Sequence, residues 1–280
     1  SSAAYRRRYH PLLPSVYQAP YPYCYRCPFQ RQPGSCELSC LRDLETTLKH
    51  RISADEVAAV IIEPFLGEGG YVPAPPAFLT ALRALCDRHG IMLIFDEVQS
   101  GMGRTGHWFA SEISGVIPDI MAVAKGIASG FPLSAVVARK EIMDQWPSGA
   151  HGTTFGGNPV SCAACRATID VINEDSLLEK TAVRGAAVLE RIGELAEKHP
   201  VVGQVRGHGF MIGIEFVTPE GLPGHDACKK VIDHCLENGV IVINCGFERN
   251  VIRLIPPLVT SDAELDFGLN VLEEGVRRLV

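Results

Sequence analysis

The chain has 280 residues, of which 46% are hydrophobic, so it can bury a sizeable core and is long enough for two domains. Its 26 basic and 32 acidic side chains give a formal net charge of −6, without the clustered basic residues that nucleic-acid binders carry. No apolar run reaches the roughly 18–20 residues of a membrane span, and the first residues lack the apolar region of a signal peptide. We therefore expect a soluble, cytoplasmic protein that binds neither nucleic acid nor membranes.

Residues 1–40 are rich in Pro, Tyr and Cys and show little periodicity, so we expect an extended segment on the surface. Four of the ten cysteines lie here as a C-x2-C pair and a C-x3-C pair: Cys24, Cys27, Cys36 and Cys40. This spacing resembles a zinc site. The alternative is a surface loop of reduced thiols or a labile disulfide. The other six cysteines lie in apolar or helical contexts and are expected to be small core residues.

Helical and strand patterns alternate between residues 41 and 138, which predicts an α/β sheet domain. Helices are expected at Leu41–Lys49 and at Pro75–His89, the second of which Gly90 would end. Four near-continuous apolar runs are typical of buried strands: Val57–Ile62, Ile91–Phe95, Ile120–Ala124 and Leu133–Ala138.

The pattern changes near residue 170, so we expect a large domain over residues 1–170 and a smaller α+β domain over residues 171–280. A helix with proline in its first turn, Asn158–Ile172, would close the first domain. The second domain would contain helices at Leu177–His199, His225–Glu237 and Asp262–Leu279, and strands at 211–216, 240–244 and 251–256.

Two of the apolar runs in the first domain end in a charged residue, Asp96 after the second run and Lys125 after the third. Ligands of open α/β sheets bind outside the carboxyl ends of the strands, so both side chains are expected in one crevice. A desolvated lysine here is a candidate Schiff-base nucleophile, and a carboxylate can pair with the protonated nitrogen of a pyridoxal ring. The alternatives are a lysine that merely extends into solvent, and an aspartate that caps a helix or pairs with Arg104.

Three motifs take this interpretation further: FDEVQSGMGRTG (95–106), AKGIASGFPLSA (124–135) and HGTTFGGNP (151–159). In order and spacing they resemble those of the class III pyridoxal-phosphate aminotransferases, and the resemblance extends over nearly the whole chain. It implies fold type I, with a mostly parallel sheet in the large domain and pyridoxal 5'-phosphate as cofactor. It also implies a homodimer whose active sites lie at the subunit interface.

The resemblance further implies roles for five residues. Lys125 would bind the cofactor aldehyde covalently and later act as the general base that moves a proton between substrate and cofactor. Asp96 would keep the ring nitrogen protonated, Val98 would contact the ring face, and Gln99 would hydrogen-bond the phenolic oxygen. Thr154 would reach the cofactor phosphate of the other subunit. Without the motif, a turn hydroxyl bonded to the local backbone is the simpler interpretation of Thr154.

Glu68, in the turn EPFLGEGGY, and Arg253, in the strand NVIRLIPPLV, bear on the substrate. An arginine between apolar strand neighbours is usually paired with an anionic group. In the 4-aminobutyrate and ornithine branches of the family, the matching arginine binds the α-carboxylate of glutamate or 2-oxoglutarate. The matching glutamate covers that arginine when an ω-amino substrate is bound. This implies ping-pong transfer from a 4-aminobutyrate-like amino acid to 2-oxoglutarate. The alternative is a structural ion pair between domains.

Two other functions stay open. Racemases and epimerases of the same fold use the same lysine without net amino transfer. In addition, the opening third of the family pattern has no match here. That third carries a phosphate-binding loop at a helix N-terminus, an aromatic that stacks on the ring, a second substrate arginine and the first strands of the sheet. We therefore expect these 280 residues alone to expose apolar sheet edges and to bind the cofactor weakly, and a non-catalytic fragment is the third possibility.

Overall fold

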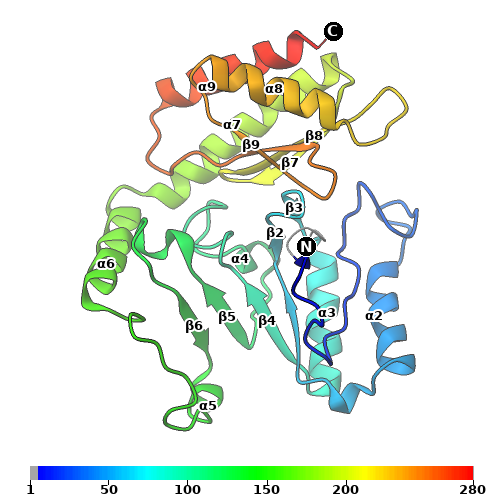
Figure 1. Ribbon diagram of the computed structural model, residues 1–280, viewed down its shortest axis with the longest axis vertical. Coiled ribbons are helices and arrows are strands. Elements are labelled where there is room, and N and C mark those ends of the chain that lie inside the picture. The colour runs from blue at the N-terminus through cyan, green and yellow to red at the C-terminus, as the bar shows by residue number, and fades with distance from the viewer. Residues whose placement is uncertain (1–5, 280) are drawn as a thin grey trace.

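The computed structural model describes residues 6–279 and contains two four-stranded sheets, the second above the first in the view of Figure 1. The first sheet has the order β1 (Ala59–Ile62), β4 (Met92–Asp96), β5 (Ile120–Val123) and β6 (Ala135–Ala138). β1, β4 and β5 are parallel, whereas β6 runs antiparallel to β5. The connection 124–134 is too short for the crossover of about a dozen residues or more that a parallel neighbour needs.

Helices α2 (Ser39–His50) and α3 (Pro76–His89) share one apolar core with β1 and β4. The first turn of α3 contains Pro76, which suits that position, and the helix ends at Gly90 with a left-handed φ of 66°. Both helices and all four strands were predicted, with ends shifted by at most two residues. A short hairpin that was not predicted, β2 (Phe65–Leu66) and β3 (Val72–Pro73), follows β1.

The second sheet is antiparallel and has the order β7 (Val202–His208), β8 (Met211–Phe216), β10 (Val251–Leu254) and β9 (Ile243–Cys245). It shares a core with α7 (Leu177–Lys198), α8 (His225–Glu237) and α9 (Asp262–Arg277). α6 (Pro159–Glu174) and α7 lead from one sheet to the other (Figure 1). The shorter helices are α4 (Ser111–Ser114) and α5 (Lys140–Met143). The domain boundary near residue 170 stays a prediction.

Both edge strands of the first sheet carry exposed apolar side chains. Ile61 of β1 is 65% exposed, and Val136 and Val137 of β6 are 50% and 55% exposed. Free edges with apolar side chains can accept further strands or another chain. The expectation that this chain exposes apolar sheet edge is confirmed. None of the helices within residues 6–279 is long and apolar enough to cross a membrane.

The cysteine-rich segment has only turns and bends between residues 7 and 38, as expected for an extended segment. Its four cysteines are half-buried free thiols around a cavity of about 20 Å³. Burial, reinforced by neighbouring thiols, raises the pKa of Cys24 and Cys40. In the described part of the chain no group of three or more His, Cys, Asp or Glu residues is arranged to hold a metal ion. The zinc hypothesis therefore gains no support from the geometry.

Helix α7 approaches the β7–β8 turn so closely that only glycine fits at position 185. A Cβ there would lie 2.2 Å from the carbonyl oxygen of Gly209. We expect Gly185→Ala to lower the free energy of unfolding by about 1–3 kcal/mol, because the two backbones would have to move apart. Urea unfolding monitored by circular dichroism measures this change.

The same helix offers a matched control in Gly193, where an added Cβ would meet nothing within 4 Å. Gly193→Ala is expected to raise the free energy of unfolding by up to about 1 kcal/mol, since alanine loses less backbone entropy in a helix. Equal effects of the two substitutions would contradict the close approach at Gly185.

Candidate active site

A cavity of about 320 Å³ opens at the carboxyl ends of β4 and β5 and is closed on its far side by the second sheet. Lys125 follows β5, Gln99 follows β4, Glu68 belongs to the β2–β3 turn and Arg253 to β10. Four of the seven predicted site residues thus line one cavity, although they come from four separate parts of the chain.

Lys125 is held in an unusual backbone conformation. Its φ is 48°, in the left-handed region that residues other than glycine rarely adopt. Lys125 is also the first residue of a 3₁₀ turn, Lys125–Ala128. Strained backbone of this kind persists where the surrounding structure imposes it and is concentrated at functional sites. The expected desolvation of Lys125 is wrong, because its side chain is exposed on the cavity wall, where its amine can reach a ligand.

Asp96 ends β4 and pairs in register with Ala122 of β5, so the two predicted charged residues do come from neighbouring parallel strands. The Val98 N–H donates to Oδ1 of Asp96 at 3.0 Å, which orients the half-buried carboxylate at the strand end. The alternative ion pair with Arg104 is wrong. The Arg104 guanidinium donates to the carbonyl of Pro256, and within residues 6–279 no ion pair joins it to Asp96.

Glu63 is a further charged residue at this edge of the first sheet. It follows β1, and its carboxylate accepts the Gly67 N–H at 2.8 Å. Desolvation raises the pKa of Glu63, and the nearby charges of Asp96 and Glu68 act in the same direction, whereas Lys125 opposes them. Asp96 and Lys125 are therefore close enough to the same group to affect its ionisation.

Glu97, the neighbour of Asp96, supports the loop behind the site, and the sequence reasoning missed it. It is fully buried and accepts hydrogen bonds from the Ser100 hydroxyl and from the N–H groups of Ala110 (3.0 Å) and Ser111 (2.8 Å). Desolvation raises the pKa of Glu97, although these donors act against that change. The bonds hold the loop after β4 in place and thereby orient Asp96. Strand alternation was the available signal, because a carboxylate next to Asp96 has to point to the opposite face.

Glu68 and Arg253 form an ion pair on the cavity wall, between Oε1 of the glutamate and Nη1 of the arginine. The Gln99 amide nitrogen also donates to this oxygen, at a long 3.5 Å. Desolvation acts to lower the pKa of Arg253, but the neighbouring Glu68 raises it overall, so the guanidinium stays charged. The arginine side chain is only 14% exposed and that of the glutamate 53%, so the glutamate is the partner that can move.

Two buried polar atoms at this pair have no hydrogen-bond partner: Oε1 of Gln99 and Nε of Arg253. Buried polar groups are nearly always paired in folded proteins, so unpaired ones indicate where a polar ligand can bind.

Thr154 does not line this cavity. It lies exposed in the segment between α5 and α6, whereas Glu68, Gln99, Lys125 and Arg253 line the cavity. A contact between Thr154 and a ligand at the Lys125 of its own chain is therefore unsupported, and its reach to a partner subunit stays a prediction.

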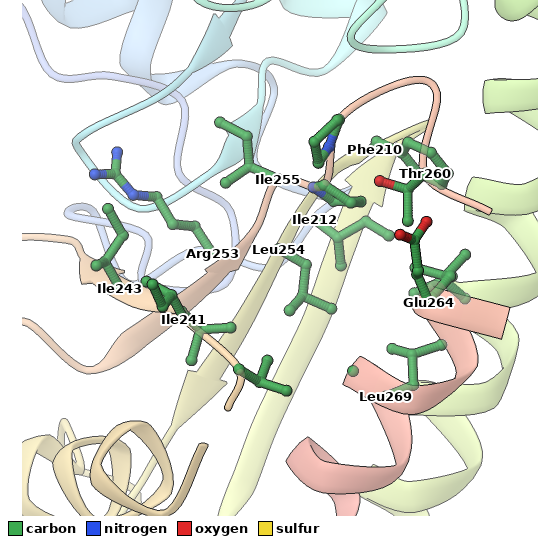
Figure 2. A pocket seen from close by; sticks show the side chains of 17 residues that line it. Phe210, Ile212, Ile241, Ile243, Arg253, Leu254, Ile255, Thr260, Glu264 and Leu269 are labelled. Atoms are coloured by element: carbon green, nitrogen blue, oxygen red, sulfur yellow. The ribbon is translucent and has the colours of Figure 1, made fainter. Parts of the chain in front are cut away.

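A second cavity, of about 360 Å³, lies between β9, β10 and α9 (Figure 2). Arg253 and Ile243 stand at one end of it, and Thr260 and Glu264 at the other. Most of its remaining wall is aliphatic, and the Glu264 carboxylate is engaged by Ser261 in the cap of α9. A nucleophile comparable to Lys125 does not line it, so the candidate chemistry lies in the first cavity.

Comparisons with known proteins show which proteins this chain is similar to. The sequence profile described as aminotransferase class-III matches residues 1–276. A leucine/methionine racemase of Thermococcus litoralis is 41% identical over 94% of this chain and 60% of its own length. A 4-aminobutyrate aminotransferase of Escherichia coli is 40% identical over 94% of this chain and 61% of its own. The solved structure of a Bacillus anthracis aminotransferase superposes with a TM-score of 0.91 at 33% identity, covering 99% of this chain and 64% of that one. The chain thus spans about three fifths of the length of these curated relatives.

Proposed function

Because this chain belongs to the class III aminotransferase family, we propose that the protein is a pyridoxal-phosphate-dependent transaminase with a ping-pong mechanism. It would move an amino group from a 4-aminobutyrate-like ω-amino acid to 2-oxoglutarate. The observation that carries this proposal is the Glu68–Arg253 pair on the wall of the cavity that Lys125 lines. The family and the fold type I architecture that the motifs indicated are both confirmed.

The residues around the cavity fit pyridoxal phosphate. Lys125 would hold the aldehyde carbon, and the Asp96 carboxylate on the neighbouring strand would hold the protonated ring nitrogen. Val98 would contact the ring face. The Gln99 amide nitrogen makes only a long contact with Glu68, so it can turn to donate to the phenolic oxygen. When bound, the cofactor supplies an electron sink for the charge that develops at the substrate carbon.

Lys125 is the proposed base. Its amine would take the proton from the substrate carbon that bears the amino group and deliver it to the adjacent cofactor carbon. The strained turn places the Lys125 backbone at the carboxyl end of β5, and its long, exposed side chain would let one amine reach both positions.

Arg253 and Glu68 would let one cavity accept two kinds of substrate. An ω-amino acid has no carboxylate on the carbon that bears its amino group, so Glu68 would stay paired with the half-buried arginine while such a substrate is bound. The Glu68–Arg253 ion pair supports this proposal. The α-carboxylate of glutamate would replace Glu68 on the guanidinium and form charge-assisted hydrogen bonds with it.

The test compares two half-reactions in the Arg253→Gln variant. We expect wild type to release one equivalent of carbonyl product per active site from 4-aminobutyrate without any keto acid. Arg253→Gln should lower kcat/KM for 2-oxoglutarate by about tenfold to a hundredfold, which corresponds to the loss of one charge-assisted hydrogen bond. We expect a smaller decrease in kcat/KM for 4-aminobutyrate. Arg249→Gln, at an exposed arginine just before β10, is the matched control. An equal loss in both half-reactions would support a purely structural ion pair instead.

A racemase is the second candidate, because relatives with that activity are as similar to this chain as the transaminases are. An isoleucine 2-epimerase of Lentilactobacillus buchneri, for example, is 40% identical over 98% of this chain. A racemase would exchange the α-hydrogen of an amino acid for deuterium and invert the chirality without releasing a carbonyl product. The half-reaction with 4-aminobutyrate therefore separates the two activities.

We also infer a homodimer with shared active sites. The support is the exposed position of Thr154, away from the cavity of its own chain, in a motif that resembles the phosphate-contacting segment of the family. The cytoplasmic location and the weak binding of cofactor by these 280 residues alone stay predictions, and a non-catalytic chain is the third candidate.

A further inference from the structure

Arg206, in β7, reaches from the second sheet to the β2–β3 turn that carries Glu68. Its Nη2 donates to the carbonyl oxygen of Gly70 at 2.6 Å, and its Nε donates to that of Tyr71 at 3.0 Å. The side chain is only 7% exposed and does not line the Lys125 cavity. A planar guanidinium that donates to two consecutive carbonyls holds both peptide planes in one orientation.

The turn needs such support because its backbone is strained. Gly70 has a φ of 131°, and Tyr71 has a φ of 53°, a conformation that a bulky residue rarely adopts. On the other side of the turn, the Gly246 N–H donates to the carbonyl oxygen of Glu68 at 2.9 Å. The second sheet and its loops therefore hold the Glu68 turn at three carbonyl groups.

Glu215, in β8, holds the remaining side of the Arg206 guanidinium. Its Oε2 accepts from Nη1 of Arg206 at 2.7 Å, and its side chain is fully buried. Tyr23 and Arg26 of the cysteine-rich segment donate to the same carboxylate. Desolvation acts to raise the pKa of Glu215, but these donors lower it overall, so it remains a charged partner for Arg206 at neutral pH.

We propose that Arg206 is a positioning residue that keeps Glu68 opposite Arg253 and so sets the preference between ω-amino and α-amino substrates. Arg206 touches neither the cavity nor a reacting atom. By fixing Gly70 and Tyr71, it favours the state in which Glu68 neutralises Arg253, which is the state that an ω-amino donor requires. This inference rests on the proposed function of the Glu68–Arg253 pair.

The test uses Arg206→Lys in the holoenzyme. Lysine keeps a positive charge beside Glu215, but one ammonium cannot reproduce the fork that reaches two carbonyls and a carboxylate. Arg26→Lys is the matched control, since Arg26 pairs with the same carboxylate and has no hydrogen bond with the turn. We expect Arg206→Lys to lower kcat/KM for 4-aminobutyrate, relative to that for glutamate, by about tenfold, and Arg26→Lys to keep this ratio within about twofold.

Hydrogen exchange measured by mass spectrometry gives a readout that does not depend on catalysis. The N–H groups of Gly70 and Tyr71 both donate to the carbonyl of Gly67 at 3.1 Å, within the turn itself. Arg206→Lys should speed their exchange by about tenfold, because the turn opens more often, and should leave the exchange of α9 unchanged. Arg26→Lys should change neither.

Three outcomes separate the positioning role of Arg206 from the substrate switch at Glu68. If Arg206→Lys lowers both half-reactions by the same factor, or leaves the exchange of the turn unchanged, the positioning role is wrong. If Glu68→Gln shifts the ratio of the half-reactions and Arg206→Lys does not, only the positioning role fails and the substrate switch stands. If Glu68→Gln leaves the ratio unchanged as well, the switch and the positioning role are both wrong.

Discussion

At a saturating concentration of cofactor, replacing Lys125 by alanine is expected to abolish amino transfer, with kcat falling by about 10³-fold or more. Two functions are lost together, since the amine is both the proposed attachment point and the proposed base. The substitution leaves the fold intact, because Lys125 is exposed on the cavity wall and follows β5 without belonging to it. Steady-state assays measure the loss of kcat, and thermal unfolding of the same preparations measures whether the fold is kept.

Borohydride reduction followed by peptide mass mapping tests the attachment directly. We expect the cofactor mass on the wild-type peptide that contains Lys125 and on no peptide of Lys125→Ala. Lys140→Ala is the matched control, because Lys140 is an exposed lysine whose ammonium pairs with Asp144 four residues later. Cofactor trapped mainly at another lysine, or activity retained by Lys125→Ala, would contradict the assignment.

Asp96→Asn is expected to lower kcat by about 10²- to 10³-fold, the cost of removing one preorganised charge from a site. Asparagine has the same shape and can still accept the Val98 N–H through its side-chain oxygen, so the end of β4 keeps its geometry. It carries no negative charge, however, and cannot hold a ring nitrogen in its protonated form. The loss should therefore appear in kcat rather than in the stability of the protein.

Two measurements separate charge from structure at Asp96. Asp144→Asn, at an exposed aspartate that pairs with Lys140, should leave kcat unchanged. A cofactor analogue methylated at the ring nitrogen carries a permanent positive charge there and should restore part of the rate of Asp96→Asn. An Asp96→Asn enzyme as active as wild type would show that this carboxylate does not serve the ring.

The prediction of elements succeeded where one side of an element is continuously apolar. Helix α8, His225–Glu237, was predicted with the bounds it has, because its buried face repeats at helical spacing. β7 was missed because VGQVRGH mixes glycines and polar residues in an edge strand, of which only Val202 and Arg206 are fully buried. The β2–β3 hairpin was missed because two residues per strand carry no detectable period.

The sequence by itself placed Asp96 and Lys125 at the ends of neighbouring strands, because a charged residue that directly follows a buried apolar run in a parallel sheet lies at the carboxyl end of its strand. Its motifs also determined the family. The contact between Glu68 and Arg253, 185 residues apart, was implied by the family resemblance alone, and the tertiary structure contains it. Only the tertiary structure decided that Arg206 holds the turn that carries Glu68. These contacts join two sheets, and their geometry depends on how the sheets pack, which no local pattern of residues encodes.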